Sequence, residues 1–178
     1  MSRLVGVALL VVAVPFPPAS PGGPAGPEVP KEIAVPPGHK LLAKVEAKGV
    51  QIYKAVEAKP GQLGWAFEAP LADLGDGKGA KAGYHYEGPS WEAADGSKVV
   101  WDKAEKVKSA PAPDAKADIP WLLIKVRAEA RAGAFSRVVF VQRVRTAGGQ
   151  APETAPKRAG TKIGIAYRAV YYFYAKAD

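Results

Sequence analysis

The segment from residue 84 to residue 95 holds the densest cluster of side chains that could do chemistry. Its members are aromatic, imidazole and carboxylate groups: Tyr84, His85, Tyr86, Glu87, Trp91, Glu92 and Asp95. If residues 84–87 form a strand, side-chain alternation places His85 opposite Tyr84 and Tyr86 and on the same face as Glu87. An imidazole beside a carboxylate is the usual start of general acid–base catalysis, with Glu92 as a second candidate acid. The same pair is also an ordinary structural hydrogen bond, so the pattern leaves both interpretations open.

Other catalytic schemes lack the spacing that they need. A metal site would join His85 to His39, the only other histidine, yet no H-x-H or H-E-x-x-H pair is present. No serine lies in a G-x-S-x-G motif. A two-carboxylate glycosidase needs acids that face each other across a cleft, and spacing alone does not place them. The glycine-rich run 75–79 has neither the preceding apolar strand nor the following amphipathic helix of a phosphate loop. We expect no metal and no cofactor.

Aromatic side chains offer a non-catalytic alternative. Exposed Trp and Tyr rings present a flat apolar face with a polar edge, which suits the binding of sugars. Trp91 and Trp101 are flanked by charged residues near the predicted Asp95-Gly96 turn, so we expect them to be exposed. The candidate binding residues are Tyr84, Tyr86, Trp91, Asp95 and Trp101.

The chain is basic, with 25 Lys and Arg against 17 Asp and Glu and a formal net charge of +8. Two groups of cations stand out, Lys98, Lys103, Lys106 and Lys108 in one segment and Arg137, Arg143 and Arg145, which we expect to share one strand face. Exposed together, they would suit an acidic polymer, an envelope phosphate or an anionic headgroup. Equally, such residues solvate a strand face and protect sheet edges.

Composition excludes several classes of chemistry. The 178 residues are 48% hydrophobic and 24% charged, the balance of one globular domain. There is no Cys and no Asn. Disulfides, thiol nucleophiles, zinc–thiolate sites, iron–sulfur clusters and N-glycosylation are therefore excluded.

The first residues predict export. A basic start at Arg3 precedes an apolar run over 4–14, which Pro15 ends, as in a secretory signal peptide and too short for a membrane span. We predict a signal peptide over 1–20, with cleavage as late as residue 25, and keep an uncleaved signal anchor as the alternative. Export places the protein in the periplasm, in the cell envelope or outside the cell, and argues against a nucleic-acid partner. The mature protein is expected to have no transmembrane span.

A proline-rich stretch follows the signal. Residues 15–37 hold nine of the 17 prolines, so 21–37 is predicted to be an extended Pro/Gly-rich linker. Order is expected to begin between Ile33 and His39, and residues 38–178 form the single domain.

The domain is predicted to be all-β. Residues 41–48 alternate, with Leu41, Ala43, Val45 and Ala47 expected on one face. Further strands are predicted over 50–57, 65–67, 83–87, 97–107, 121–130, 135–145 and 167–174, with loops over 71–83, 109–118 and 148–160. The segment that begins at Trp121 leaves a helix as the alternative. Short strands separated by Gly/Pro turns indicate one antiparallel sandwich or barrel-like domain.

Ordered fragments along the domain resemble a known family. They include Gly49-Val50-Gln51-Ile52-Tyr53, Trp65-Ala66-Phe67, Tyr84-His85-Tyr86, Gly88-Pro89-Ser90-Trp91-Glu92, Ile119-Pro120-Trp121-Leu122-Leu123, Gln142-Arg143 and Tyr171-Tyr172-Phe173-Tyr174. Over about residues 35 to 175 the chain resembles DUF3455, an uncharacterised family of exported proteins from bacteria and fungi. The resemblance implies export and a single β-domain, and it transfers no catalytic residue. Relatives often carry a Cys just after the Gln-Ile-Tyr fragment and another in the loop after Ala-Pro, where this chain has Ala55 and residues 153–156.

Three functions remain open at this stage. The leading hypothesis is a non-catalytic exported binding module for a glycan or an anionic envelope or extracellular ligand. The alternative is an extracytoplasmic hydrolase with an acid–base centre at His85 with Glu87 or Glu92. The third is a structural or interaction protein that uses a sheet edge.

Overall fold

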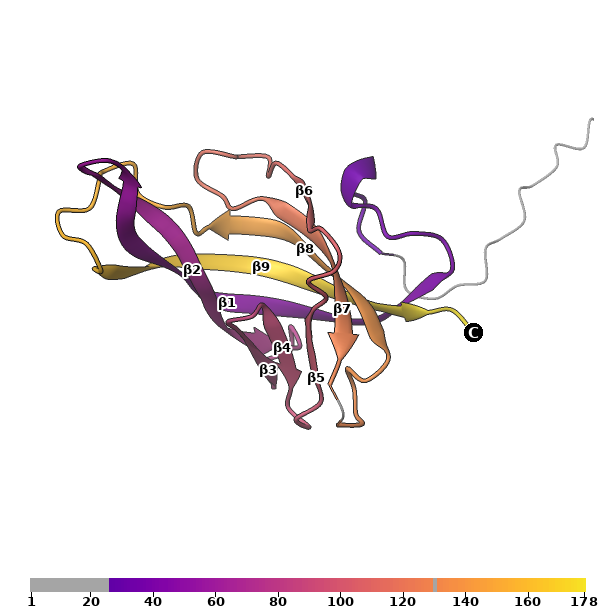
Figure 1. The fold of residues 1–178 in the computed structure, drawn as a ribbon. Helices are drawn as coiled ribbons and strands as arrows, with labels where there is room; N and C mark the ends of the chain where they lie inside the picture. Colours follow the sequence, from indigo (N-terminus) through magenta and orange to yellow (C-terminus); the bar gives the residue numbers. More distant parts are fainter. Residues whose placement is uncertain (1–25, 130) are drawn as a thin grey trace, which may run out of the picture.

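The computed structural model describes residues 26–129 and 131–178, and the predicted signal peptide over 1–20 lies outside them. The described chain is almost entirely β (Figure 1). Its elements are a short 3-10 helix η1 (Lys31–Ile33) and the strands β1 (His39–Lys59), β2 (Gln62–Gly75), β3 (Lys81–Tyr86), β4 (Ser90–Ala93), β5 (Lys98–Trp101), β6 (Lys108–Ala110), β7 (Trp121–Ala128), β8 (Val138–Gly148) and β9 (Lys162–Lys176). No helix in this part of the chain is long and apolar enough to cross a membrane.

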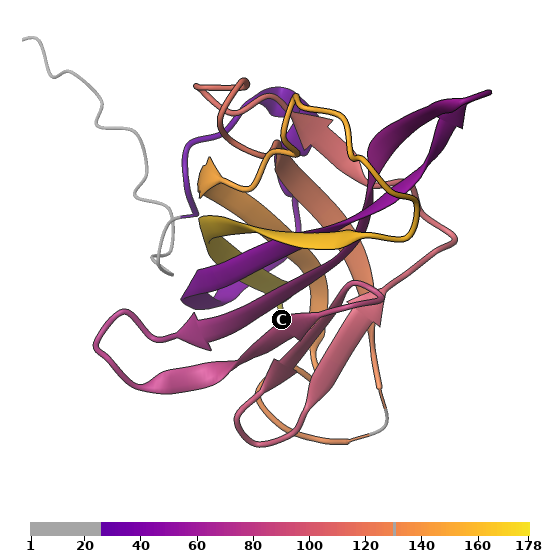
Figure 2. The same ribbon diagram turned by 90° about the vertical axis from the view of Figure 1, so that its left-hand side faces the viewer.

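The described strands form one antiparallel sheet that closes on itself. Its order is β5-β4-β3-β2-β1-β9-β8-β7-β6, and β5 also pairs with β7 through Val99↔Ala128, Val100↔Arg127 and Trp101↔Val126. That pairing makes a ring of eight strands, with β6 as an additional strand on the edge of β7. Figure 2 shows the strands curving around a common interior. The predicted all-β, sandwich or barrel-like domain is confirmed, in its closed form.

Alternation along β1 explains why one face lines the interior. Val45 and Ala47 are buried in the interior core, whereas Glu46 and Lys48 are exposed. The prediction that Leu41 shares their face is wrong, because it packs on the outer side of the sheet. The pairing of β1 with β9 shifts register between Leu41 and Ala43, and this bulge reverses the direction of every side chain before it.

Two hydrophobic clusters lie on opposite sides of the sheet. The interior cluster includes Val99, Phe135, Val138 and Phe173, and the rings of Phe135 and Phe173 stack with their centroids 4.3 Å apart. The outer cluster contains buried residues of β6, β7, β8 and β9 together with one residue of η1: Ile33, Ala110, Leu123, Val144, Tyr172 and Tyr174. Tyr171–Tyr174 therefore serves both clusters, as aromatic residues on both faces of one strand require.

The described part of the predicted linker, residues 26–37, covers the outer cluster. Ile33 is fully buried, and Val29 and Val35 pack beside it. The backbone oxygen of Ile33 accepts a hydrogen bond of 2.8 Å from Nε2 of Gln142 on β8. Proline excludes this stretch from helix interiors and sheet ladders, but its apolar side chains still bury against the sheet.

Several predicted boundaries differ from the structure. Residues 71–75 continue β2 and residues 81–86 form β3, so the predicted loop over 71–83 shrinks to a turn. The glycines of this segment suggested a loop, but Gly83 lies inside β3. Glycine is needed there because a Cβ would collide with the carbonyl oxygen of Glu92 on the neighbouring strand β4. The strand predicted over 97–107 ends at Trp101, where the Asp102 carboxylate accepts from the amide of Ala104 at 3.2 Å and starts a turn. Trp121 begins a strand, not a helix.

Replacing Ile33 by Ala is expected to destabilise the protein by about 3 kcal/mol, because it deletes a buried side chain and leaves a cavity. Urea unfolding measured at equilibrium checks this value. Glu32→Ala, at an exposed neighbouring position, is the control and should change the unfolding free energy little. An Ile33→Ala protein as stable as the wild type would show that residues 26–37 do not pack on the sheet in solution.

Candidate functional site

The interior of the barrel is hollow at one end. A cavity of about 290 Å³ lies where β7 and β4 begin and β3 and β8 end. Aromatic and aliphatic side chains and prolines form most of its wall, and a few polar groups interrupt it: Gln51, Tyr53, Phe67, Pro70, His85, Pro89, Trp91, Ile119, Pro120, Leu122, Ile124, Arg143, Gln150 and Tyr171. A mainly apolar concave site with a few convergent polar groups is the usual form of a small-molecule site.

Among the described residues that line the cavity, Arg143 alone is charged at neutral pH. It lies on β8, and only 9% of the residue is exposed. Its Nε and Nη2 donate to the backbone oxygen of Pro120 at 3.2 and 2.8 Å. Within residues 26–129 and 131–178 the guanidinium has no ion pair with a carboxylate, and its Nη1 makes no hydrogen bond. The guanidinium stays charged, because it does not lose its proton in a protein. Without an ion pair, this buried positive charge is uncompensated.

Three further polar groups of the wall have no hydrogen-bond partner among the described residues. They are Nε2 of Gln51, Nε1 of Trp91 and the hydroxyl of Tyr171, and each residue is at most 2% exposed. Tyr171 is the cross-strand partner of Arg143. Burial raises the pKa of the Tyr171 hydroxyl, and the charge of Arg143 together with the proximity of the Tyr167 hydroxyl and the Arg143 side chain opposes this. All three groups can donate a hydrogen bond, and two of them can only donate.

His85 is buried inside the barrel and neutral. It is 2% exposed, and its Nδ1 lies 2.8 Å from the backbone oxygen of Ser90. Since a carbonyl only accepts, Nδ1 carries the proton and Nε2 is left as an acceptor. Burial lowers the pKa of His85 to about 3, with a smaller contribution from the Arg143 charge, and the Ser90 hydrogen bond opposes this.

The predicted acid–base pair is not formed. His85 does face away from Tyr84 and Tyr86, as the alternation predicted. Glu87, however, lies in the exposed turn after β3 and not on the face of His85, because the strand ends at Tyr86. Glu92 accepts a 2.6 Å hydrogen bond from the hydroxyl of Tyr86. The two glutamates are therefore kept away from the imidazole.

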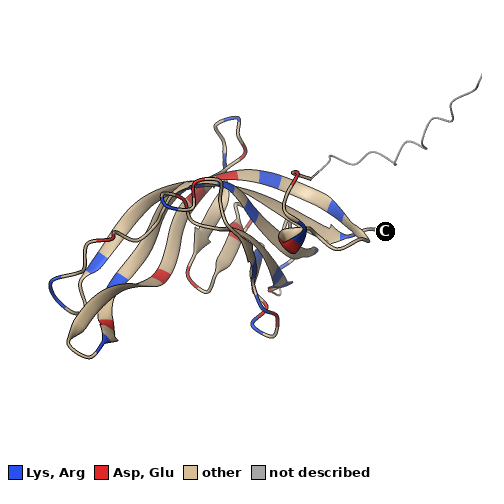
Figure 3. Ribbon diagram, turned by 90° about the horizontal axis from the view of Figure 1, so that it is seen from above, with Lys and Arg blue, Asp and Glu red and all other residues tan. Residues whose placement is uncertain are grey.

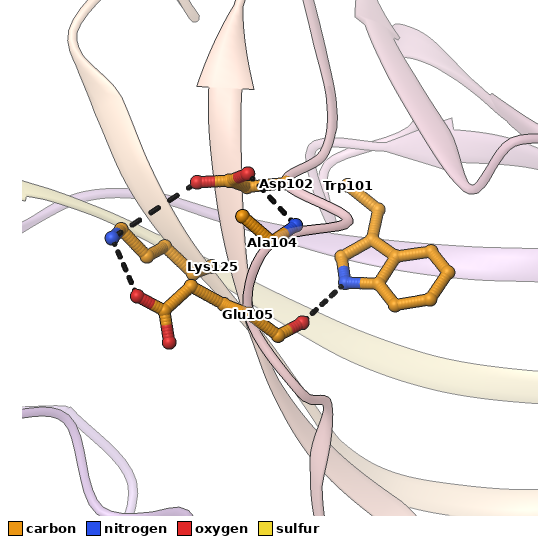
Figure 4. Close-up of polar contacts among 5 residues, drawn as sticks. All are labelled: Trp101, Asp102, Ala104, Glu105 and Lys125. Carbon is orange, nitrogen blue, oxygen red and sulfur yellow. Dashed lines mark hydrogen bonds and ion pairs between the residues drawn. The ribbon is translucent and has the colours of Figure 1, made fainter.

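The predicted exposure of Trp91 is wrong. It is 1% exposed, and its ring points into the barrel because the charged neighbour Glu92 follows it on the opposite face of the strand. Trp101 is half-buried and packs against the interior core. Its indole nitrogen donates to the backbone oxygen of Glu105 at 3.1 Å, and Lys125 holds the Glu105 carboxylate at 2.9 Å (Figure 4). These hydrogen bonds give Trp101 a role in stabilising the turn that follows β5.

Asp95 holds two segments together. Its carboxylate accepts from the amide and the hydroxyl of Ser97 at 2.9 and 2.6 Å, and from the amide of Ala134 at 2.8 Å. The hydrogen bond from Ser97, followed by that from Ala134, lowers the pKa of Asp95 to about 2. Ser97 in turn accepts from the amide of Phe135 at 3.0 Å. The hydrogen bonds of the Asp95 carboxylate are thus made to other residues of the fold.

Tyr84, another candidate, is exposed, and the ammonium of Lys81 lies 3.8 Å from the centroid of its ring.

The predicted basic face is divided. Arg143 points into the barrel and Arg145 is exposed, so the expectation that both share a face with Arg137 is wrong. The pairing of β8 with β9 shifts register between Val144 and Ala147, and Arg145 has a φ of 50°, so the bulge turns its side chain outward. Lys98 lies 3.4 Å from the Glu129 carboxylate. In Figure 3, Lys and Arg are interleaved with Asp and Glu over several strands and loops.

The two histidines lie on different sides of the sheet. His39 contacts Phe140, a residue of the outer cluster, whereas His85 lies inside the barrel. Among the described residues no three His, Asp or Glu side chains gather in a way that would hold a metal ion.

Sequence reasoning missed the polar residues that matter most in the cavity. Gln51 and Tyr171 were not among the candidates, and Arg143 was considered only as one of three cations on an expected basic strand face, although one signal for its burial was present. Gln142 and Arg143 are adjacent polar residues inside the apolar run 138–144. On a strand buried on both faces, one of two adjacent residues must point inward.

The stability of the protein is expected to fall as the pH drops from 7 to 5, because His85 binds a proton in the unfolded chain and not in the folded one. With a pKa of about 3 when folded and 6.5 when unfolded, this contribution is full above pH 6.5 and declines below it. The loss between pH 7 and 5 is about 2 kcal/mol for one proton. Urea unfolding across this range measures it.

Two variants identify the source of this pH dependence. His85→Phe keeps an aromatic ring in place and should lose most of the slope, whereas His39→Gln should retain it. A wild-type slope that survives in His85→Phe would contradict a buried neutral His85.

Comparison with known proteins identifies the family of this domain. Residues 36–175 match the family model described as "Protein of unknown function (DUF3455)". No curated protein and no solved structure matches the chain. The match covers most of the chain, which therefore belongs to the DUF3455 family.

Proposed function

We propose that the protein is a non-catalytic binding module that holds a small organic anion inside its barrel. The observation that carries this proposal is the buried guanidinium of Arg143, which no described carboxylate compensates. Removing an unpaired charge from water costs several kcal/mol. An anion bound in the cavity would offset that cost when it binds.

The polar groups around Arg143 support the same choice of ligand. The hydroxyl of Tyr171 and the amide nitrogen of Gln51 are buried donors without partners on the cavity wall. A cluster of donors beside a positive charge is complementary to a carboxylate, which only accepts hydrogen bonds. The apolar remainder of the wall calls for an apolar body attached to that carboxylate.

The geometry favours binding over catalysis. His85 is the only imidazole in the cavity, and it lacks a carboxylate to orient it, because its Nδ1 is bonded to the Ser90 carbonyl. Its low pKa makes it a weak base at neutral pH. Export, which the N-terminus predicts, would make the ligand a molecule of the envelope or of the surroundings.

Binding of benzoate is the direct test, with benzamide as its neutral isostere. In isothermal titration calorimetry the wild type is expected to bind benzoate, and Arg143→Gln should weaken binding by about 10- to 100-fold, the effect of one charge-assisted hydrogen bond. Benzamide should bind more weakly than benzoate to the wild type and equally to both proteins.

A matched charge variant separates the site from the general field of the protein. Arg168→Gln removes the same charge from an exposed position on β9 and should leave benzoate binding unchanged. Equal losses in both variants would assign the effect to net charge. Wild-type protein that binds none of benzoate, phenylacetate and cyclohexanecarboxylate would contradict the proposal.

Replacing Arg143 by Met is expected to stabilise the ligand-free protein by about 1–3 kcal/mol, because an apolar chain of similar length avoids burying a charge. The two hydrogen bonds to Pro120 are lost, but Pro120 is exposed and water can replace them. Chemical denaturation of both proteins without ligand measures the difference. A strongly destabilised Arg143→Met protein would show that Arg143 serves the fold and not a ligand.

A further inference from the structure

The cavity wall carries a second pair of polar side chains, His85 and Trp91. These residues are direct cross-strand partners on β3 and β4, and their rings stack with centroids 4.5 Å apart and planes 10° apart. Tyr171 meets both rings edge-on, at centroid distances of 5.1 and 5.8 Å. Tyr171 is also the cross-strand partner of Arg143, so it neighbours both this pair and Arg143.

The chemistry of the His85–Trp91 pair differs from that of Arg143. Nε1 of Trp91 is a buried donor with no partner among the described residues. Nε2 of His85 is an acceptor, because Nδ1 donates to the Ser90 carbonyl. A carboxylate would meet this acceptor with its own lone pairs, whereas a hydroxyl accepts one hydrogen bond and donates another. One donor and one acceptor on stacked rings therefore match a hydroxyl group.

The rest of the cavity wall is mainly apolar and partly aromatic. Tyr53 and Phe67 are in edge-to-face contact at 5.9 Å, and Leu122 and Ile124 contribute aliphatic surface. A volume of about 290 Å³ is at the small end of ligand sites. Such a space suits one flat ring, whereas a sugar would bring several hydroxyls that these side chains cannot pair with.

We propose that the ligand is a hydroxylated aromatic carboxylate. Its carboxylate binds at Arg143, its ring lies among the apolar side chains, and its phenolic hydroxyl accepts from Trp91 and donates to His85. This proposal rests on the proposed function and adds the class of molecule that the site selects.

Calorimetric titration of the purified protein at pH 7.5 tests the hydroxyl. The probes are benzoate, 3- and 4-hydroxybenzoate, their methyl ethers and glucuronate. One hydroxybenzoate is expected to bind about tenfold more tightly than benzoate and than its own methyl ether, which accepts a hydrogen bond but cannot donate one. Glucuronate, an anion rich in hydroxyls without a flat ring, is expected to bind least.

A variant assigns the effect to His85. In His85→Phe the ring stack is retained and the acceptor is removed, so the ratio of the hydroxybenzoate and benzoate affinities should fall to within about twofold. His39→Phe, on the outer side of the sheet, should keep the wild-type ratio. If His85→Phe fails to fold, the comparison of hydroxybenzoate with its methyl ether in the wild type decides alone.

Two results would overturn the proposal while leaving the proposed function intact. One is Arg143-dependent binding of benzoate without any preference for a hydroxybenzoate. The other is tighter binding of glucuronate than of every aromatic acid. Absence of binding for all of these anions would overturn both proposals together.

Discussion

The pairing of β5 with β7 is the constraint on which the rest of the structure depends. It consists of three residue pairs, and through it an open sheet becomes a ring with an inside. A strand as short as β5 contributes few ladder hydrogen bonds, so its position needs other support. The carboxylate of Asp95 and the hydroxyl of Ser97 supply it by holding the turn before β5 to residues 134 and 135. Asp95, a carboxylate of the cluster over residues 84–95, thus helps to close the barrel.

Closure leaves the two ends of the barrel unequal. At one end Phe135, Val138 and Phe173 fill the interior as a packed core. At the other end Tyr171, His85 and Trp91 pack against one another but leave a cavity beside them. Three residues of the cavity wall carry buried polar atoms without a partner among the described residues, and burying such atoms lowers stability. Proteins keep such destabilising groups mainly at functional sites.

Sequence periodicity predicted much of the fold and little of the site. Alternation of apolar residues identified most strands, because one face of each strand must be buried in a closed sheet. It failed where a bulge adds a residue: the register shifts near Leu41 and Arg145 reverse the faces of their neighbours, and no residue type announces them. The charged residues beside Trp91 suggested that its ring is exposed. Adjacent residues on a strand point to opposite sides, however, and the ring is buried.

The most informative residue was hidden by its own type. Arginine is usually exposed, so Arg143 was grouped with Arg137 and Arg145 as part of a basic surface. What sets it apart is its partner set: a backbone carbonyl in place of a carboxylate, and a tyrosine hydroxyl without a partner beside it. A buried site with fixed donors rejects a neutral analogue more strongly than it rewards extra apolar contact, because the unpaired groups stay unpaired. Recognition at the proposed site would therefore be governed by charge and hydrogen bonding, with the apolar wall setting the size of the ligand.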